Sequence, residues 1–93
     1  MSENKCTERE RILADAAALI CGDRQAQYGA PADNFARIAA GWAVIIGKPV
    51  TPDQVALCMA WLKIARLVNG PHMDSYTDGA AYLALAAELA DGK

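Results

Sequence analysis

The chain has 93 residues, of which 54% are hydrophobic and only 6% aromatic, and its formal net charge is −2. This length predicts one small domain, 1–93, and the lack of a basic block argues against binding to duplex nucleic acid. No uncharged apolar run approaches the roughly 20 residues of a membrane span, so no membrane role is expected.

The first helix is predicted over 7–21. Thr7, followed three residues later by Glu10, has the pattern of a capping box, and Gly22 stands where a left-handed C-terminal cap belongs. The polar start MSENKCTERE is unlike a secretory signal peptide, so we expect residues 1–6 to be flexible and the protein to be cytoplasmic. Apolar residues then recur at helical spacing, at Ile12, Ala16, Leu19 and Ile20.

The second helix is predicted over 31–46, after the polar connection GDRQAQYGAPADN. Pro31 favours the first position of a helix, and the Gly47-Lys48-Pro49 run ends it. Its expected buried face consists of Phe35, Ile38, Ala39, Trp42, Ile45 and Ile46.

The third helix is predicted over 52–69. Thr51 can cap it and Pro52 suits its first position, while the run Asn69-Gly70-Pro71 stops it. The segment VALCMAWLKIARLV is apolar on nearly every side, which is typical of a buried helix. We therefore expect this helix at the centre of the fold or in an oligomer interface.

The fourth helix is predicted over 74–90, although Gly79 inside it costs roughly 1 kcal/mol of helix propensity relative to alanine. Short connections favour antiparallel neighbours, so the expected fold is all-α, a small four-helix up-and-down bundle. A chain this short and this apolar has more hydrophobic surface than one small core can bury. We therefore expect a homo-oligomer.

Few polar residues interrupt the last two helices, and they form two groups of one charge sign. Lys63 and Arg66 share one helix face, and Asp74, Asp78 and Tyr82 follow one another at four-residue steps on the next. One interpretation is an ion-pair network, with Arg66 against Asp74 or Asp78, that fixes the helix register. The other is a site in which the cations bind phosphate and Tyr82 forms the pocket wall.

A second candidate cluster lies around the first connection. Arg24 and Tyr28 belong to the connection itself, and Asn34 and Arg37 share one face of the second helix. With three cysteines and a single histidine, His72, the chain lacks the pattern of a disulfide framework or a structural zinc site. We assign no catalytic residue and no metal ligand.

The stretches GDRQAQYGAPADNFARIAAGW, VALCMAWLKIARL and HMDSYTDGAAYLAL together resemble a family of small helical proteins found widely in bacteriophage and prophage genomes. The resemblance runs from about Ile12 to Leu89. It implies a phage or prophage origin, hence the cytoplasm of a bacterial host, and no established activity. The matching positions are Asp23, Arg24, Tyr28, Gly29, Pro31, Asn34, Phe35, Lys63, Arg66, Asp74, Asp78 and Tyr82.

More distantly, Asp74-x-x-x-Asp78 followed by Tyr82 is similar to the MazG-type all-α nucleoside triphosphate pyrophosphohydrolases. Those enzymes gather Glu-x-x-Glu and Glu-x-x-Asp motifs around magnesium. This chain lacks Glu-x-x-Glu, and its third helix offers Lys63 and Arg66 where carboxylates are needed.

We therefore expect a phage-type accessory protein that binds a nucleotide or another phosphorylated small molecule without turnover, and that needs no cofactor. The expected ligand-binding residues are Arg24, Tyr28, Asn34, Arg37, Lys63, Arg66, Asp74, Asp78 and Tyr82. One alternative is a MazG-like pyrophosphohydrolase that requires Mg²⁺. The other is a protein-interaction module that acts on a host factor.

Overall fold

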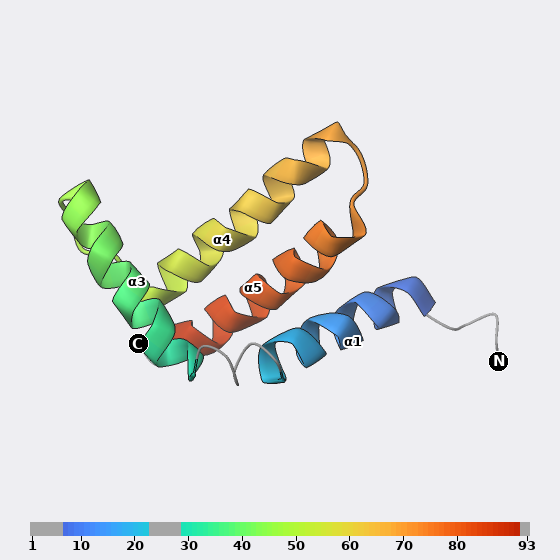
Figure 1. The fold of residues 1–93 in the computed structure, drawn as a ribbon, viewed down its shortest axis with the longest axis horizontal. Coiled ribbons are helices and arrows are strands. Elements are labelled where there is room, and N and C mark those ends of the chain that lie inside the picture. Colours follow the sequence, from blue (N-terminus) through green and yellow to red (C-terminus); the bar gives the residue numbers. More distant parts are fainter. Residues whose placement is uncertain (1–6, 23–28, 92–93) are drawn as a thin grey trace.

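The computed structural model describes residues 7–22 and 29–91, and within these ranges every regular element is helical (Figure 1). In chain order the elements are α1 (Thr7–Cys21), α3 (Pro31–Ile46), α4 (Pro52–Arg66), the short 3₁₀ helix η2 (Leu67–Asn69) and α5 (Met73–Asp91). The predicted all-α class, a small helical bundle, is confirmed.

Local signals account for the helix ends. The Gln54 side-chain oxygen accepts a hydrogen bond of 2.9 Å from the Thr51 backbone N–H, which closes one half of a capping box before Pro52. Gly47 ends α3 in the left-handed conformation, with φ of 81°, and its N–H donates to the Ala43 carbonyl at 2.8 Å. These contacts involve neighbours in sequence, which is why the sequence could indicate them.

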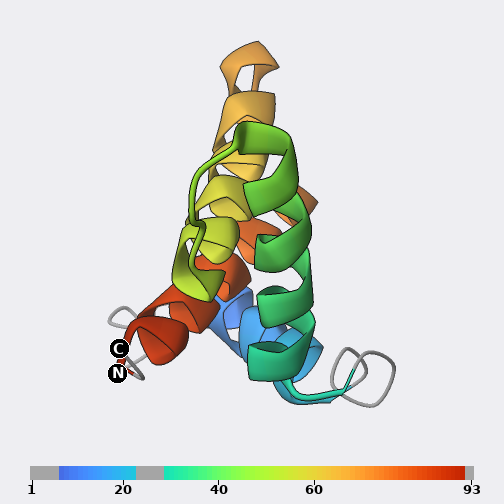
Figure 2. The ribbon, with the colours of Figure 1, turned by 90° about the vertical axis from the view of Figure 1, so that its left-hand side faces the viewer.

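The helices pack around α5. Because the connection after η2 is short, α4 and α5 form an antiparallel hairpin, and α1 packs along the other side of α5 (Figure 1). Helix α3 lies beside the beginning of α4 and then points away from α5 (Figures 1 and 2). The bundle is therefore open on the side between α3 and α4.

The core lies where α3, α4 and α5 meet. Four of its eight buried residues are alanines, and these small side chains let the helix backbones approach closely. Tyr82 and Leu85 bring the larger side chains of α5 into it. The full set is Phe35, Ala39, Val55, Ala56, Ala60, Tyr82, Leu85 and Ala86.

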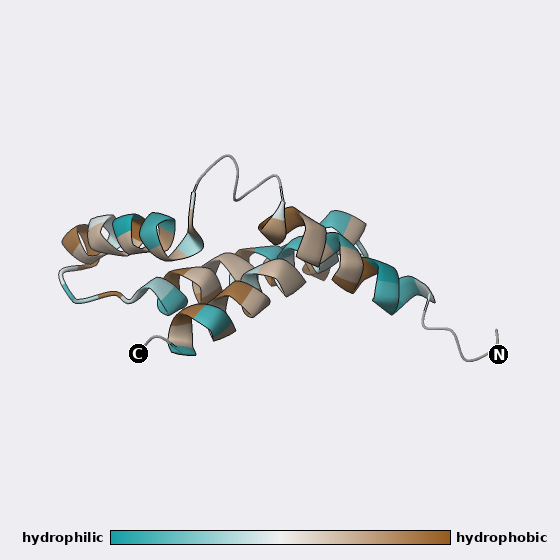
Figure 3. Ribbon diagram, turned by 90° about the horizontal axis from the view of Figure 1, so that it is seen from below, coloured by the Kyte–Doolittle hydropathy of each residue, from teal (hydrophilic) through white to brown (hydrophobic). Residues whose placement is uncertain are grey.

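One expectation about burial is wrong. On α3, Phe35 and Ala39 are buried as expected, but Ile45 and Ile46 are 84% and 59% exposed because the second half of this helix has diverged from α4. Figure 3 shows this hydrophobic end of α3 at the outer edge of the molecule.

Helix α4, expected at the centre of the fold or in an oligomer interface, is covered on one side only within the single chain. Val55, Ala56 and Ala60 are buried against its neighbours, whereas Leu57 and Trp61 are exposed. Among residues 7–22 and 29–91, no helix has the length and hydropathy needed to cross a bilayer.

Candidate functional site

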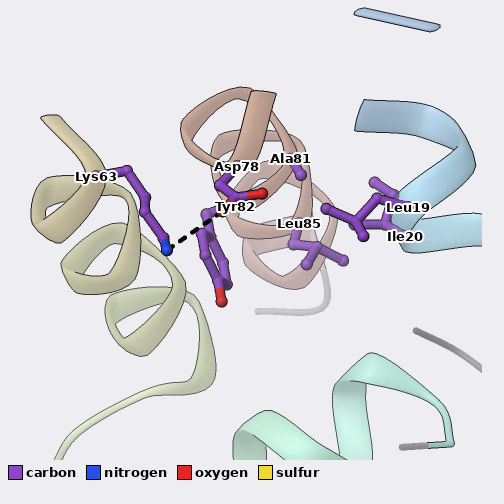
Figure 4. Close-up of a pocket in the computed structure, with 7 residues that line it drawn as sticks. All are labelled: Leu19, Ile20, Lys63, Asp78, Ala81, Tyr82 and Leu85. Atoms are coloured by element: carbon purple, nitrogen blue, oxygen red, sulfur yellow. Dashed lines mark ion pairs between the residues drawn. The ribbon is translucent and has the colours of Figure 1, made fainter. Parts of the chain in front are cut away.

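One ion pair joins α4 to α5. The Lys63 Nζ lies 3.2 Å from Oδ2 of Asp78, and the two side chains are 16% and 31% exposed (Figure 4). Lys63 lies on the side of α4 that faces α5, and Asp78 lies one turn into α5 after Asp74. The predicted electrostatic link between the last two helices therefore exists, and it is made by Lys63 rather than Arg66.

This ion pair lies at the wall of a cavity of about 270 Å³. Figure 4 shows Lys63 reaching it from α4, Leu19 and Ile20 from α1, and the remaining side chains from α5 between them. Because three helices contribute, the cavity exists only in the folded bundle. Its lining consists of Leu19, Ile20, Lys63, Asp78, Ala81, Tyr82 and Leu85.

The spacing along α5 explains its share of this lining. Asp78, Tyr82 and Leu85 are separated by four and then three residues, so they occupy one helix face. The buried Tyr82 ring packs near the Phe35 ring of α3, with centroids 6.5 Å apart and planes inclined by 41°. Tyr82 therefore belongs both to the core and to the lining of the cavity.

The chemistry of the lining is mixed. Lys63 supplies an ammonium, Asp78 a carboxylate and Tyr82 an aromatic ring, whose hydroxyl points away from Asp78 in Figure 4, whereas the α1 residues supply only apolar surface. The formal charges of Lys63 and Asp78 cancel, so the wall is polar but has no net charge. Within residues 7–22 and 29–91, no three His, Cys, Asp or Glu side chains are placed to hold a metal ion together.

Of the nine residues expected to bind a ligand, the structure brings Lys63, Asp78 and Tyr82 together at this cavity. Arg66 and Asp74 are exposed, and neither makes the ion pair that one interpretation assigned to them. On α3, Asn34 is half-buried, Arg37 is exposed, and neither lines the cavity. Arg24 and Tyr28 lie outside the described residues.

The apolar lining was not expected as part of a site. Leu19 and Ile20 belong to the apolar stripe predicted for the first helix. The sequence therefore indicated that they are buried, but it did not indicate which residues of the other helices they contact. Ala81 and Leu85 lie three and seven residues after Asp78. Their helical spacing from Asp78 was the signal that could have linked them to the charged residues.

The chain is similar to phage proteins of unknown function. A family described as "Domain of unknown function (DUF6378)" matches residues 11–90. The Gene 55 protein of Mycobacterium phage D29 is 42% identical over 74 residues, which is 78% of this chain and 49% of the relative. The Gene 55 protein of Mycobacterium phage L5 is 40% identical over 80 residues, which is 84% of this chain and 51% of the relative.

The chain thus spans about half the length of these curated relatives. No solved structure matches it. The resemblance to a phage family of unknown function is confirmed.

Proposed function

We propose that this chain, which belongs to the DUF6378 family of unknown function, binds a small phosphorylated molecule of nucleotide type in the cavity between α1, α4 and α5. The observation that carries the proposal is the Lys63 ammonium, which lies at the wall of this cavity and is largely shielded from solvent. The polar lining groups offer binding contacts, and the proposal includes no turnover.

Lys63 can accept a ligand without giving up Asp78. An ammonium has three donors, and the ion pair directs it to a single carboxylate oxygen of Asp78 at 3.2 Å. A phosphate oxygen in the cavity can therefore share the ammonium with Asp78. Asp78 would fix the position of Lys63 before the ligand arrives, which lowers the entropic cost of binding.

The size and charge of the cavity favour a compact ligand. Its volume of about 270 Å³ lies just below the range of about 300–1,000 Å³ that is typical of small-molecule sites. A balanced ion pair is a poor match for the accumulated charge of a triphosphate. Tyr82, Leu85 and Ile20 offer apolar surface to a base or sugar, so a nucleoside monophosphate fits the lining best.

Isothermal titration of the wild-type chain with nucleoside mono-, di- and triphosphates and with sugar phosphates tests this proposal. We expect the tightest binding for a monophosphate and a loss of about tenfold or more in Lys63→Met, because a hydrogen bond to a charged group contributes about 1.5–3 kcal/mol. Arg66→Met is the matched control. It removes a cation from the same helix but outside the cavity, and should bind as the wild type does.

A charge swap separates a ligand site from a purely structural ion pair. Lys63→Asp combined with Asp78→Lys keeps opposite charges on α4 and α5, so thermal stability should be largely retained. The cation then reaches the cavity from the other helix, and ligand affinity should fall. Two results would contradict the proposal. In one, the wild type binds no member of the panel; in the other, Lys63→Met binds as tightly as the wild type.

A further inference from the structure

The exposed side of α4 is almost wholly apolar. Within Pro52–Arg66, which the structure describes throughout, Arg66 is the only exposed charged residue, and it lies in the last turn. Trp61, the largest side chain on this side, is 68% exposed. The other exposed residues of α4 are Gln54, Leu57, Cys58, Leu62, Ile64 and Ala65. A helix surface of this composition is unfavourable in water and needs a partner.

The large apolar residues on this side follow a helix-pairing pattern. Leu57, Trp61 and Ile64 are separated by four and three residues, and Val68 of η2 follows four residues later. Alternating steps of four and three are the seam spacing of two helices that pack side by side. The opposite side of α4, with Val55, is already buried against α5 and α3, so this seam is a second one.

A groove runs beside the seam. It has a volume of about 500 Å³ and lies between Trp42 of α3 and the α4 side chains Leu57, Cys58, Trp61 and Leu62. The groove exists because α3 diverges from α4 after their initial contact (Figure 1). We refer to the seam and the groove together as the α4 face, consisting of Trp42, Leu57, Cys58, Trp61, Leu62, Ile64 and Val68.

The α4 face has the size of a dimer interface. From the exposed fractions of Leu57, Trp61, Leu62, Ile64 and Val68, which lie between 42% and 84%, we put its area at roughly 600 Å², at the upper end of the 300–600 Å² of a typical monomer's largest patch and approaching the 800 Å² that each partner contributes to a stable complex. Val68 alone is 84% exposed.

We infer that the α4 face binds a second copy of this chain, with the two α4 helices antiparallel across a two-fold axis. The seam is self-complementary in this arrangement: an axis midway between Trp61 and Ile64 places each Trp61 against Ile64 of the other copy. The same axis places each Leu57 against Val68 of the other copy. Such an isologous contact closes on itself and yields a dimer rather than a fibre.

The composition of the face favours a second copy over a charged partner. A face whose contact residues carry no charge offers nothing that would select an acidic or basic protein by electrostatic complementarity. It does contain a large exposed side chain, Trp61, which the two-fold axis places against an apolar side chain, Ile64, of the other copy. This inference is independent of the proposed ligand, because the cavity lies on the other side of α4.

Sedimentation velocity over micromolar to submillimolar concentrations tests the inference. One chain has a mass of 9.9 kDa, and the wild type should sediment as a particle of twice that mass. Trp61→Glu should weaken dimerisation about 30-fold or more, because a buried aromatic anchor contributes at least about 2 kcal/mol. Leu13→Glu, which places the same charge on an exposed leucine of α1, should dimerise as the wild type does. Circular dichroism of each variant reports whether the helices are intact.

A second measurement identifies the face even if Trp61→Glu fails to fold. Trp42→Phe leaves Trp61 as the only tryptophan. Acrylamide quenching of its fluorescence should fall severalfold as the concentration rises through the dimerisation range. A wild-type chain that remains monomeric overturns the inference and leaves the face to another protein or to a further segment of a longer chain. A dimer in which Trp61 stays quenchable uses another surface and overturns it as well.

Discussion

Gly79 lies on the buried side of α5, opposite Lys63 of α4. A Cβ added at Gly79 would lie 3.7 Å from the Lys63 Cβ, which is an ordinary van der Waals contact. Close packing therefore does not require a glycine here, and its lack of a side chain only weakens the helix.

We predict that Gly79→Ala stabilises the protein by about 0.5–1 kcal/mol, measured by urea unfolding. Gly47→Ala provides the opposite case. Gly47 has φ of 81° at the end of α3, where an alanine Cβ is strained, so this variant should lose about 1 kcal/mol. A loss of stability in Gly79→Ala would mean that α4 and α5 pack more tightly than these distances indicate.

At the scale of the elements, α5 is the helix on which the bundle is built, since both α1 and α4 pack along it. Its two faces differ sharply in burial. Leu85 is 3% exposed and belongs to the core, whereas Leu83, two residues earlier on the same helix, is 50% exposed. Leucine at both positions provides a matched pair.

We predict that Leu85→Ala destabilises the protein by about 3 kcal/mol, because it removes buried methyl groups and leaves a cavity among Phe35, Tyr82 and their neighbours. Leu83→Ala should change the free energy of unfolding by less than about 0.5 kcal/mol. Chemical denaturation of both variants in one buffer checks the difference. If the two variants lost the same free energy of unfolding, the face of α5 that carries Leu85 would not be the buried one.

For the whole molecule, the dimer that we infer from the α4 face would couple folding to association. Because a dimer is stabilised by mass action, the midpoint of thermal unfolding should rise by about 2–4 °C for each tenfold increase in protein concentration. In Trp61→Glu, whose dimerisation is weakened, the midpoint should be independent of concentration in the dilute range where the wild type is still a dimer. Differential scanning calorimetry over a range of dilutions distinguishes the two, and a concentration-independent wild-type midpoint would count against coupling.

Most ends of the helices were predictable because their causes are local, although the helix predicted over 52–69 ends as an α-helix at Arg66 and continues as the 3₁₀ helix η2 to Asn69. Pro31, the Thr51-Pro52 pair and Gly47 act on backbone groups within one turn, and α1 and α3 begin and end at the residues that the sequence indicated. The candidate site was predictable only in part. Lys63, Asp78 and Tyr82 could be selected because helical spacing placed them on facing stripes.

The sequence by itself thus determined the helices, their order and the antiparallel pairing of α4 with α5 across a short connection. Only the tertiary structure decided that Lys63 rather than Arg66 pairs with Asp78, that α1 completes the cavity, and that Ile45 and Trp61 remain exposed. The physical reason is that helix formation depends on neighbours in sequence. A helix that is apolar on every side does not itself determine which side is buried. That depends on how helices distant in the sequence pack against it, because a small domain can bury only a limited amount of surface.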